Sequence, residues 1–195
     1  MPIVPVFGPS SAASGGGGDM ELIFSQTLTS SATTVTTGTL PTGYHDLVLS
    51  ISAKTDRAST CGDYLLVAFN GDSNFTNNYQ IMVIDYRSNG TAVIGETANA
   101  AGGVGFITGT DPAPQPANPA NFGGCRVRIF SHESTDRYKA WEAFTSQIQN
   151  ELNCNRLRLQ SGLWQNTAAV TSVTFSASTG SDFVAGTSFF IYGVK

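Results

Sequence analysis

The residue types of a hydrolase stand together at one place in the chain, the tripeptide His132-Glu133-Ser134. Adjacent residues of an extended chain point to alternate sides, so these three cannot form a proton relay among themselves. No G-x-S-x-G elbow or other nucleophile motif occurs anywhere in the sequence. The other histidine, His45, stands beside Asp46 where a strand is expected to begin. We therefore interpret the tripeptide as a polar turn and His45 as a surface residue, and we predict that the chain is not an enzyme.

Oxygen-bearing side chains at alternate positions, Asn70, Asp72 and Asn74, match the first half of a calcium-binding loop. The match then ends, because Phe75 stands where the loop requires glycine and Ile81 stands where it requires a bidentate glutamate. Asn, Gly and Asp favour tight turns for backbone reasons alone. The segment is predicted to be a hairpin turn, and ion binding there stays open.

The three cysteines, Cys61, Cys125 and Cys154, are an odd number at wide spacings, without a C-x-x-C pair. With only two histidines in the chain, this pattern indicates neither a zinc site nor a disulfide framework. Free and mostly buried thiols are expected, since cysteine often serves as a small core residue. A Cys61–Cys125 bridge stays open, and no cofactor is expected.

The two tryptophans are the residues best suited to stack on a sugar ring. Trp141 stands between Ala140 and Ala143 in an expected strand, which is typical of a core residue. Trp164 follows Ser161-Gly162, and we predict that it is a surface ring that could bind glycan.

Composition limits the class of protein. The chain has 195 residues, of which 12% are charged, and a net charge of −4, which suits one all-β domain with many turns. Only ten Lys and Arg are spread along it, so nucleic acid and anionic membranes are not expected partners. No apolar run approaches the ~20 residues that span a bilayer, and the N-terminus lacks the regions of a signal peptide. We expect the protein to be made and to mature in a cytosol.

Residues 1–19 differ from the rest of the chain, because three prolines and four consecutive glycines prevent a helix or a regular strand. Free in solution, such an extended arm should be disordered. The apolar residues available to hold it against another surface are Ile3, Val4, Val6 and Phe7. The arm therefore points to an assembly, in which it docks on a neighbouring subunit.

Residues 20–195 carry about ten short segments with the period-2 alternation of strands and no sustained helical period. In residues 45–53, for example, Leu47, Leu49 and Ile51 lie on one face, with Ser50 and Ser52 on the other. The last strand, over 188–194, is apolar on both faces, as expected of a strand covered on both sides. This pattern predicts one antiparallel β-sandwich of jelly-roll type. The predicted core contains Leu47, Leu49, Ile51, Leu66, Val67, Ile81, Val83, Val127, Ile129, Val173, Phe175 and Ile191.

Two local expectations concern the middle of the chain. Residues 63–70 end in the turn signal Asn70-Gly71-Asp72, so residues 78–86 are expected to return as the antiparallel partner. A further short strand is expected over 91–95. Residues 95–124 are rich in glycine and carry prolines at 112, 114, 116 and 119, which predicts a long surface loop that makes contacts.

Four segments of this sequence carry a resemblance to a known group of proteins. They are Tyr44-His45-Asp46-Leu47-Val48-Leu49, Val67-Ala68-Phe69-Asn70-Gly71-Asp72, Trp164-Gln165-Asn166-Thr167-Ala168-Ala169-Val170-Thr171-Ser172-Val173 and Phe190-Ile191-Tyr192-Gly193-Val194. In these segments the chain resembles a broad group of tailed-bacteriophage virion proteins. The resemblance covers most of residues 20–195 and rests on core and turn residues, while the arm lies outside it.

The resemblance implies a fold and a setting. Members of the group are similar to decoration (cement) proteins, head fibres and tail-fibre modules, which are β-sandwiches assembled as trimers. It implies a virion structural protein that is assembled in the bacterial host cytoplasm, with capsid or tail subunits and further copies of itself as partners. The alternative is a tail-fibre or receptor-binding module that recognises host surface glycan, with Trp164 as the stacking ring.

Overall fold

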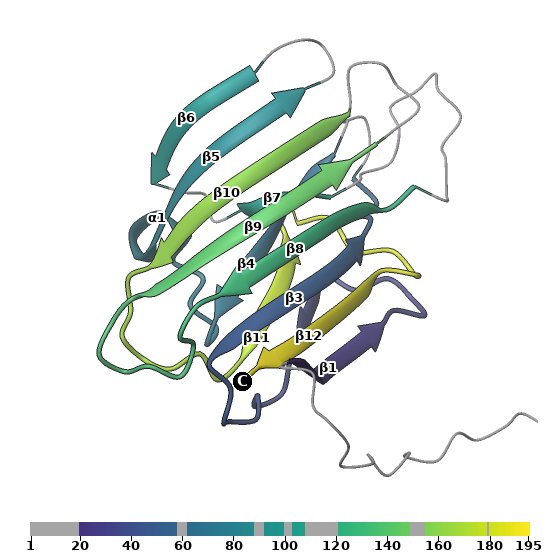
Figure 1. Cartoon of the computed structure of the whole chain (residues 1–195). Helices are drawn as coiled ribbons and strands as arrows, with labels where there is room; N and C mark the ends of the chain where they lie inside the picture. Colours follow the sequence, from purple (N-terminus) through teal and green to yellow (C-terminus); the bar gives the residue numbers. More distant parts are fainter. Residues whose placement is uncertain are drawn as a thin grey trace, which may run out of the picture.

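The computed structural model describes residues 20–57, 62–87, 92–99, 103–107, 121–148, 155–178 and 180–195. Within these ranges the chain forms two antiparallel β-sheets that pack face to face (Figure 1). The larger sheet has eight strands in the order β1-β12-β3-β8-β9-β10-β5-β6, and the smaller has four in the order β2-β11-β4-β7. The predicted all-β sandwich is confirmed, and the described part of the chain contains no helix able to cross a membrane.

The elements, in chain order, have the following bounds: β1 (Met20–Thr27), β2 (Thr34–Thr36), β3 (Asp46–Ala53), β4 (Asp63–Phe69), α1 (Phe75–Asn78), β5 (Tyr79–Arg87), β6 (Ala92–Asn99), β7 (Gly103–Ile107), β8 (Gly123–Ile129), β9 (Lys139–Gln147), β10 (Arg156–Trp164), β11 (Val173–Ala177) and β12 (Ser188–Val194).

Eight of these strands are connected as in a jelly roll. In the larger sheet β12 lies between β1 and β3, with β8 next to β3, and in the smaller sheet β11 lies between β2 and β4, with β7 next to β4. The chain therefore alternates between the two sheets from β1 to β4. It alternates again in the order β7, β8, β11 and β12, which completes the jelly-roll wrap. The other four strands, β9, β10, β5 and β6, extend the larger sheet beyond β8 (Figure 1).

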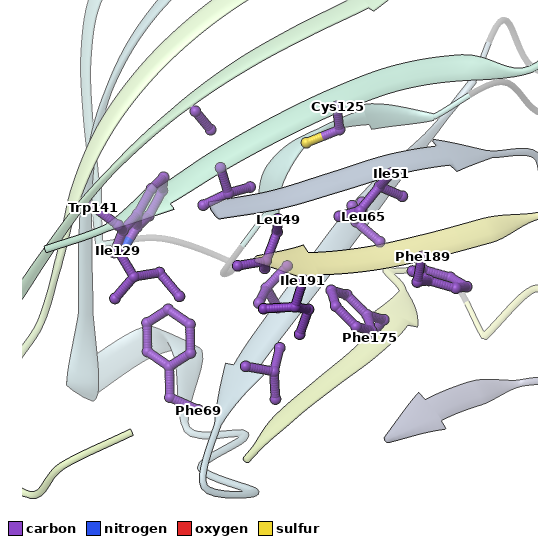
Figure 2. Packing of buried hydrophobic residues seen from close by; sticks show 14 of the residues in the cluster. Leu49, Ile51, Leu65, Phe69, Cys125, Ile129, Trp141, Phe175, Phe189 and Ile191 are labelled. Atoms are coloured by element: carbon purple, nitrogen blue, oxygen red, sulfur yellow. The ribbon is translucent and has the colours of Figure 1, made fainter. Parts of the chain in front are cut away.

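The core fills the space between the two sheets (Figure 2). Phe175 on β11 stacks on Phe189 of β12 with ring centroids 4.6 Å apart, and Phe183 meets the same ring edge-on at 5.2 Å. Of the predicted core residues, all are buried except Leu66, which is half-buried. Leu66 lies on the face of β4 opposite to Leu65 and Val67, which belong to the core.

The C-terminal strand is less fully covered than predicted. In β12 the fully buried residues are Phe189, Ile191 and Gly193, while Phe190 and Tyr192 on the other face are half-buried. The strand lies inside the larger sheet, between β1 and β3, so one face looks into the core and the other looks outward. Ordinary alternation therefore holds here, with aromatic residues on both faces.

The predicted pairing of residues 63–70 with 78–86 is wrong. A tight turn does follow β4, with Asn70 and Gly71 at φ 53° and 73° and with the Asp72 N–H bonded to the Phe69 carbonyl. Helix α1 then directs the chain into the other sheet, where β5 pairs with β10 and β6. The partners of β4 are β11 and β7. The turn was predictable from local chemistry, whereas the partner depended on the whole sheet.

The long surface loop predicted for 95–124 is only partly supported. The short strand expected over 91–95 is confirmed as β6, which continues into the predicted loop as far as Asn99. The last residues of the predicted loop form the start of β8. Between them β7 pairs with β4 as an edge strand of the smaller sheet. The proline-rich part, 108–120, lies outside the described residues.

Candidate functional site

Trp164 is not the surface ring that the sequence predicted. Its side chain is 1% exposed, and it packs in the core against Tyr79, to which it is stacked, and against Phe69. Its indole Nε1 donates a hydrogen bond to Asp72 Oδ2 at 2.8 Å. Trp164 ends β10 directly opposite Tyr79 of β5, and this register turns the ring inward. It therefore cannot stack on an external glycan, while Trp141 is buried as predicted.

The turn after β4, which the sequence analysis compared with a calcium-binding loop, makes hydrogen bonds within the fold. The Asp72 carboxylate accepts hydrogen bonds from Trp164, from the Asn78 amide at 2.8 Å and from the Asn74 N–H at 3.1 Å. These donors use the oxygens that a cation would need, and no cluster of metal ligands occurs among the described residues. Asn70 in turn accepts from the Thr171 N–H at 2.8 Å. The Asn70-Gly71-Asp72 motif and the Trp164 stretch therefore meet as one structural unit.

Asp46 is the centre of a second structural contact. It is 2% exposed and accepts two hydrogen bonds from Arg128, at 3.0 and 2.7 Å, and one from the Ser131 N–H at 2.8 Å. His45, whose side chain is 71% exposed, lies 2.7 Å from the same carboxylate. Burial opposes ionisation of Asp46, but these bonds outweigh it and hold its pKa below the ordinary value. These hydrogen bonds of Asp46 connect the start of β3 to the end of β8 and to the turn after it.

His132 lies in that turn and is buried, and it contacts the backbone of the loop at Val170. Its ring Nδ1 is 3.2 Å from the Val170 carbonyl oxygen, and its own carbonyl accepts from the Val170 N–H at 2.8 Å. Burial lowers the pKa of His132, so the folded protein favours the neutral imidazole. The polar turn predicted around the tripeptide is confirmed, and its histidine points into the fold.

His132 should make stability depend on pH. Because its pKa is lower folded than unfolded, the unfolded state binds the extra proton and stability should fall as pH drops below about 6.5. Urea unfolding at about pH 7.5 and about pH 5.5 measures this. His132→Asn should flatten the slope relative to the wild-type protein. An unchanged slope in His132→Asn would show that other groups cause the dependence.

The other residues singled out in the sequence give no site. Cys125 is free and buried, and burial raises its pKa to about 12, which makes it a core residue and not a nucleophile. Cys61 and Cys154 lie outside the described residues. So do the predicted docking residues of the arm, Ile3, Val4, Val6 and Phe7.

The surface feature that the sequence reasoning missed is an apolar patch on the outside of the larger sheet. Strands β5, β10 and β9 lie side by side in the extension of that sheet (Figure 1). These strands and Ile148, which directly follows β9, present seven large apolar side chains that are 44–75% exposed: Met82, Ile84, Tyr86, Phe144, Ile148, Leu157 and Leu159. We refer to these seven residues as the outer apolar face.

Strand register makes the outer apolar face continuous. Leu159 lies directly between Ile84 of β5 and Phe144 of β9, and Leu157 lies next to Tyr86. Side chains opposite each other on neighbouring strands are within contact distance on the same face. The patch therefore spans three strands without a charged residue in its middle.

The inner side of β10 is polar over Arg158 and Gln160, whereas elsewhere the inner side of these strands packs in the core, as Ile81, Val83 and Trp141 do. Arg158 and Asp85 are cross-strand partners and are 5% and 4% exposed, and Gln160 is 5% exposed. The Arg158 guanidinium lies over the Tyr64 ring of β4, 5.3 Å from its centroid. In β10 the sequence alternation Arg-Leu-Arg-Leu-Gln thus places the leucines outward. A strand whose apolar face points outward is typical of a surface that another molecule covers.

Two hollows border the outer apolar face. One of about 430 Å³ lies along its β8 side, lined by Arg126, Arg128, Glu142, Phe144 and Leu159. The other, of about 200 Å³, lies among Tyr86, Ile148 and Leu157. The patch is therefore shaped, with a charged border on one side and an apolar depression at one end, as interaction surfaces commonly are.

The alternation in residues 156–160 was the signal that could have revealed this surface. In this stretch two arginines and a glutamine alternate with two leucines, so one face of the strand is polar and the other is apolar. Sequence alternation gives two faces but does not say which one is inward.

Comparison of the chain with family models, with curated proteins and with solved structures finds no match in any of the three.

Proposed function

We propose that this chain is a non-enzymatic structural protein of a tailed-bacteriophage virion, a decoration (cement) or attachment protein held to the capsid or tail by its N-terminal arm. The observation that carries the proposal is the outer apolar face, seven exposed apolar side chains gathered over three neighbouring strands. Monomeric proteins seldom expose a patch of this kind. A subunit of a permanent assembly keeps such a face covered.

Two further observations support a structural role. The jelly-roll wrap is an architecture used by viral capsid proteins, among others. The residue types that could perform chemistry make contacts within the fold, since His132 lies against the Val170 carbonyl and Asp72 accepts from Trp164. The burial of Trp164 also removes the residue on which a glycan-binding role rested.

The arm is proposed as the anchor to other virion proteins. Fixing its backbone costs about 1–2 kcal/mol per residue, and each apolar side chain returns only ~1.5–3 kcal/mol when fully buried. Burial of Ile3, Val4, Val6 and Phe7 would therefore have to be joined by backbone hydrogen bonds to the partner. A phage lacking this gene, complemented by plasmid-borne variants, allows particle incorporation to be measured.

We expect deletion of residues 1–14 to leave a folded protein that fails to join the particle. Replacement of the four apolar arm residues by serine, at unchanged length, should have the same effect. The matched control replaces Ser10, Ser11 and Ser14 by alanine and should incorporate normally. Incorporation of the deletion variant at the wild-type level would place the anchor elsewhere, and absence of the wild-type chain from purified particles would contradict the proposed function.

A further inference from the structure

We infer that the outer apolar face is covered by a second copy of this chain, packed sheet against sheet. The inference rests on the proposed function, because it names the partner of the same surface. It concerns contacts between copies of the chain, whereas the arm is proposed to reach other virion proteins. The two contacts can therefore be tested separately.

The size of the face matches what association between copies requires. The seven side chains are each roughly half exposed. With about 200 Å² of accessible area for a large side chain, they present on the order of 700 Å² of apolar surface. A stable interface buries about 800 Å² per partner, and the largest patch on a typical monomer is about 300–600 Å². This face alone nearly supplies one side of a standard interface.

The shape of the face favours another sheet over the chain's own arm. Leu159 has apolar neighbours on both sides, on β5 and on β9, so the patch is three strands wide. An extended segment covers a width of about 5 Å, roughly one strand spacing. The arm also begins beyond Met20 on β1, at the opposite edge of the sheet from β6. A flat face of the same kind, on a second copy, covers the whole patch at once.

The charged border of the outer apolar face is suited to contact with the same border on a second copy. Arg128 and Glu142 are cross-strand neighbours on β8 and β9, and Arg126 lies next to Phe144. Both signs of charge therefore stand along one side of an uncharged centre. In an isologous contact the same patch is used by both copies, so a surface that carries both signs can complement itself.

Sedimentation velocity of the full chain over a concentration series tests the inference. We expect the wild-type protein to be an oligomer and Leu159→Glu to weaken association by about 100-fold or more, because the variant places an unpaired charge at the centre of the interface. The matched control is Leu22→Glu on β1 of the same sheet. Leu22 is 50% exposed and Leu159 is 49% exposed, so the two substitutions differ in position and not in burial.

The outcomes separate this inference from the proposed function. An oligomer that Leu159→Glu disperses and Leu22→Glu preserves supports the inference, whether or not the chain is later found in particles. A monomeric wild type, or an oligomer unaffected by Leu159→Glu, overturns it even if the chain is a virion component. If Leu159→Glu does not fold, Ile84→Thr, which keeps a β-branched residue in β5, carries the same test. A wild-type monomer that associates only after deletion of residues 1–14 would show that the arm covers the face, and would also overturn it.

Discussion

Replacing Gly162 by alanine is expected to destabilise the fold by about 3 kcal/mol or more, measured as a shift of the urea midpoint. Gly162 of β10 lies directly opposite Trp141 of β9. A Cβ atom on Gly162 would lie 2.0 Å from the Trp141 Cζ2 atom, closer than any real contact. Trp141 is 2% exposed and packed in the core, so its ring has little space into which it can move.

Gly124→Ala is the matched control for this prediction. Gly124 also lies within a strand of the larger sheet, and its added Cβ would meet only Ser146 Oγ at 3.7 Å, an ordinary contact. Removing a flexible glycine from a strand should stabilise by about 0.5–1 kcal/mol. In a Trp141→Leu background the cost of Gly162→Ala should shrink, because the clashing ring is gone. Equal midpoints for the two glycine variants would refute the account of this contact.

Replacing Asp72 by asparagine is expected to cost about 2–3 kcal/mol at neutral pH, because the amide keeps only one acceptor oxygen and turns an NH2 donor toward N–H groups that lose theirs. The variant keeps the shape of the side chain but presents an amide to the Trp164 indole N–H and to the Asn78 amide. Trp164 cannot turn to water, since it is 1% exposed. The loss should appear as a lower urea midpoint and as a change in tryptophan fluorescence of the folded state.

The effect of Asp72→Asn should depend on pH with a definite sign. Burial alone would raise the pKa of Asp72, but the bonds from Trp164, Asn78 and the Asn74 N–H outweigh it and lower the pKa. The stabilisation is therefore fully present above the unfolded pKa of about 3.9 and is lost as pH falls through the lower folded pKa. The difference between wild type and variant should shrink below about pH 4. Asp136→Asn, at an exposed site, should leave the midpoint unchanged, and a pH-independent difference for Asp72→Asn would contradict the charge-based explanation.

The sequence predicted the core well where one face of a strand lies over the other sheet. In β3 the alternation of Leu47, Leu49 and Ile51 with serines fixed both the strand and its buried side. It could not predict strand partners, because the four-residue helix α1, which follows the turn at Asn70, moves the chain to the other sheet. Local residues select the turn, and the sheet as a whole selects the partner.

The candidate site was less predictable, for two physical reasons. Trp164 follows Ser161-Gly162, as many surface residues do, and only its register opposite Tyr79 places it in the core. The leucines of β10 alternate with arginines, and an alternating strand reads equally well in either orientation. The arginine face is inward because Arg158 lies over Tyr64 of β4 and opposite Asp85 of β5, and residues within β10 carry no information about these neighbours.

The central claim is that the outer apolar face is covered in the working protein, and hydroxyl-radical oxidation of Met82 tests it most directly. Met82 lies within the face and is 58% exposed in the single chain, while Met20 on β1 is 46% exposed and serves as the internal reference. We expect Met82 of the wild-type oligomer to oxidise much more slowly than Met20, and the two rates to become similar in Leu159→Glu. Equal oxidation of Met82 and Met20 in the wild-type protein, at concentrations where it is fully assembled, would contradict the claim.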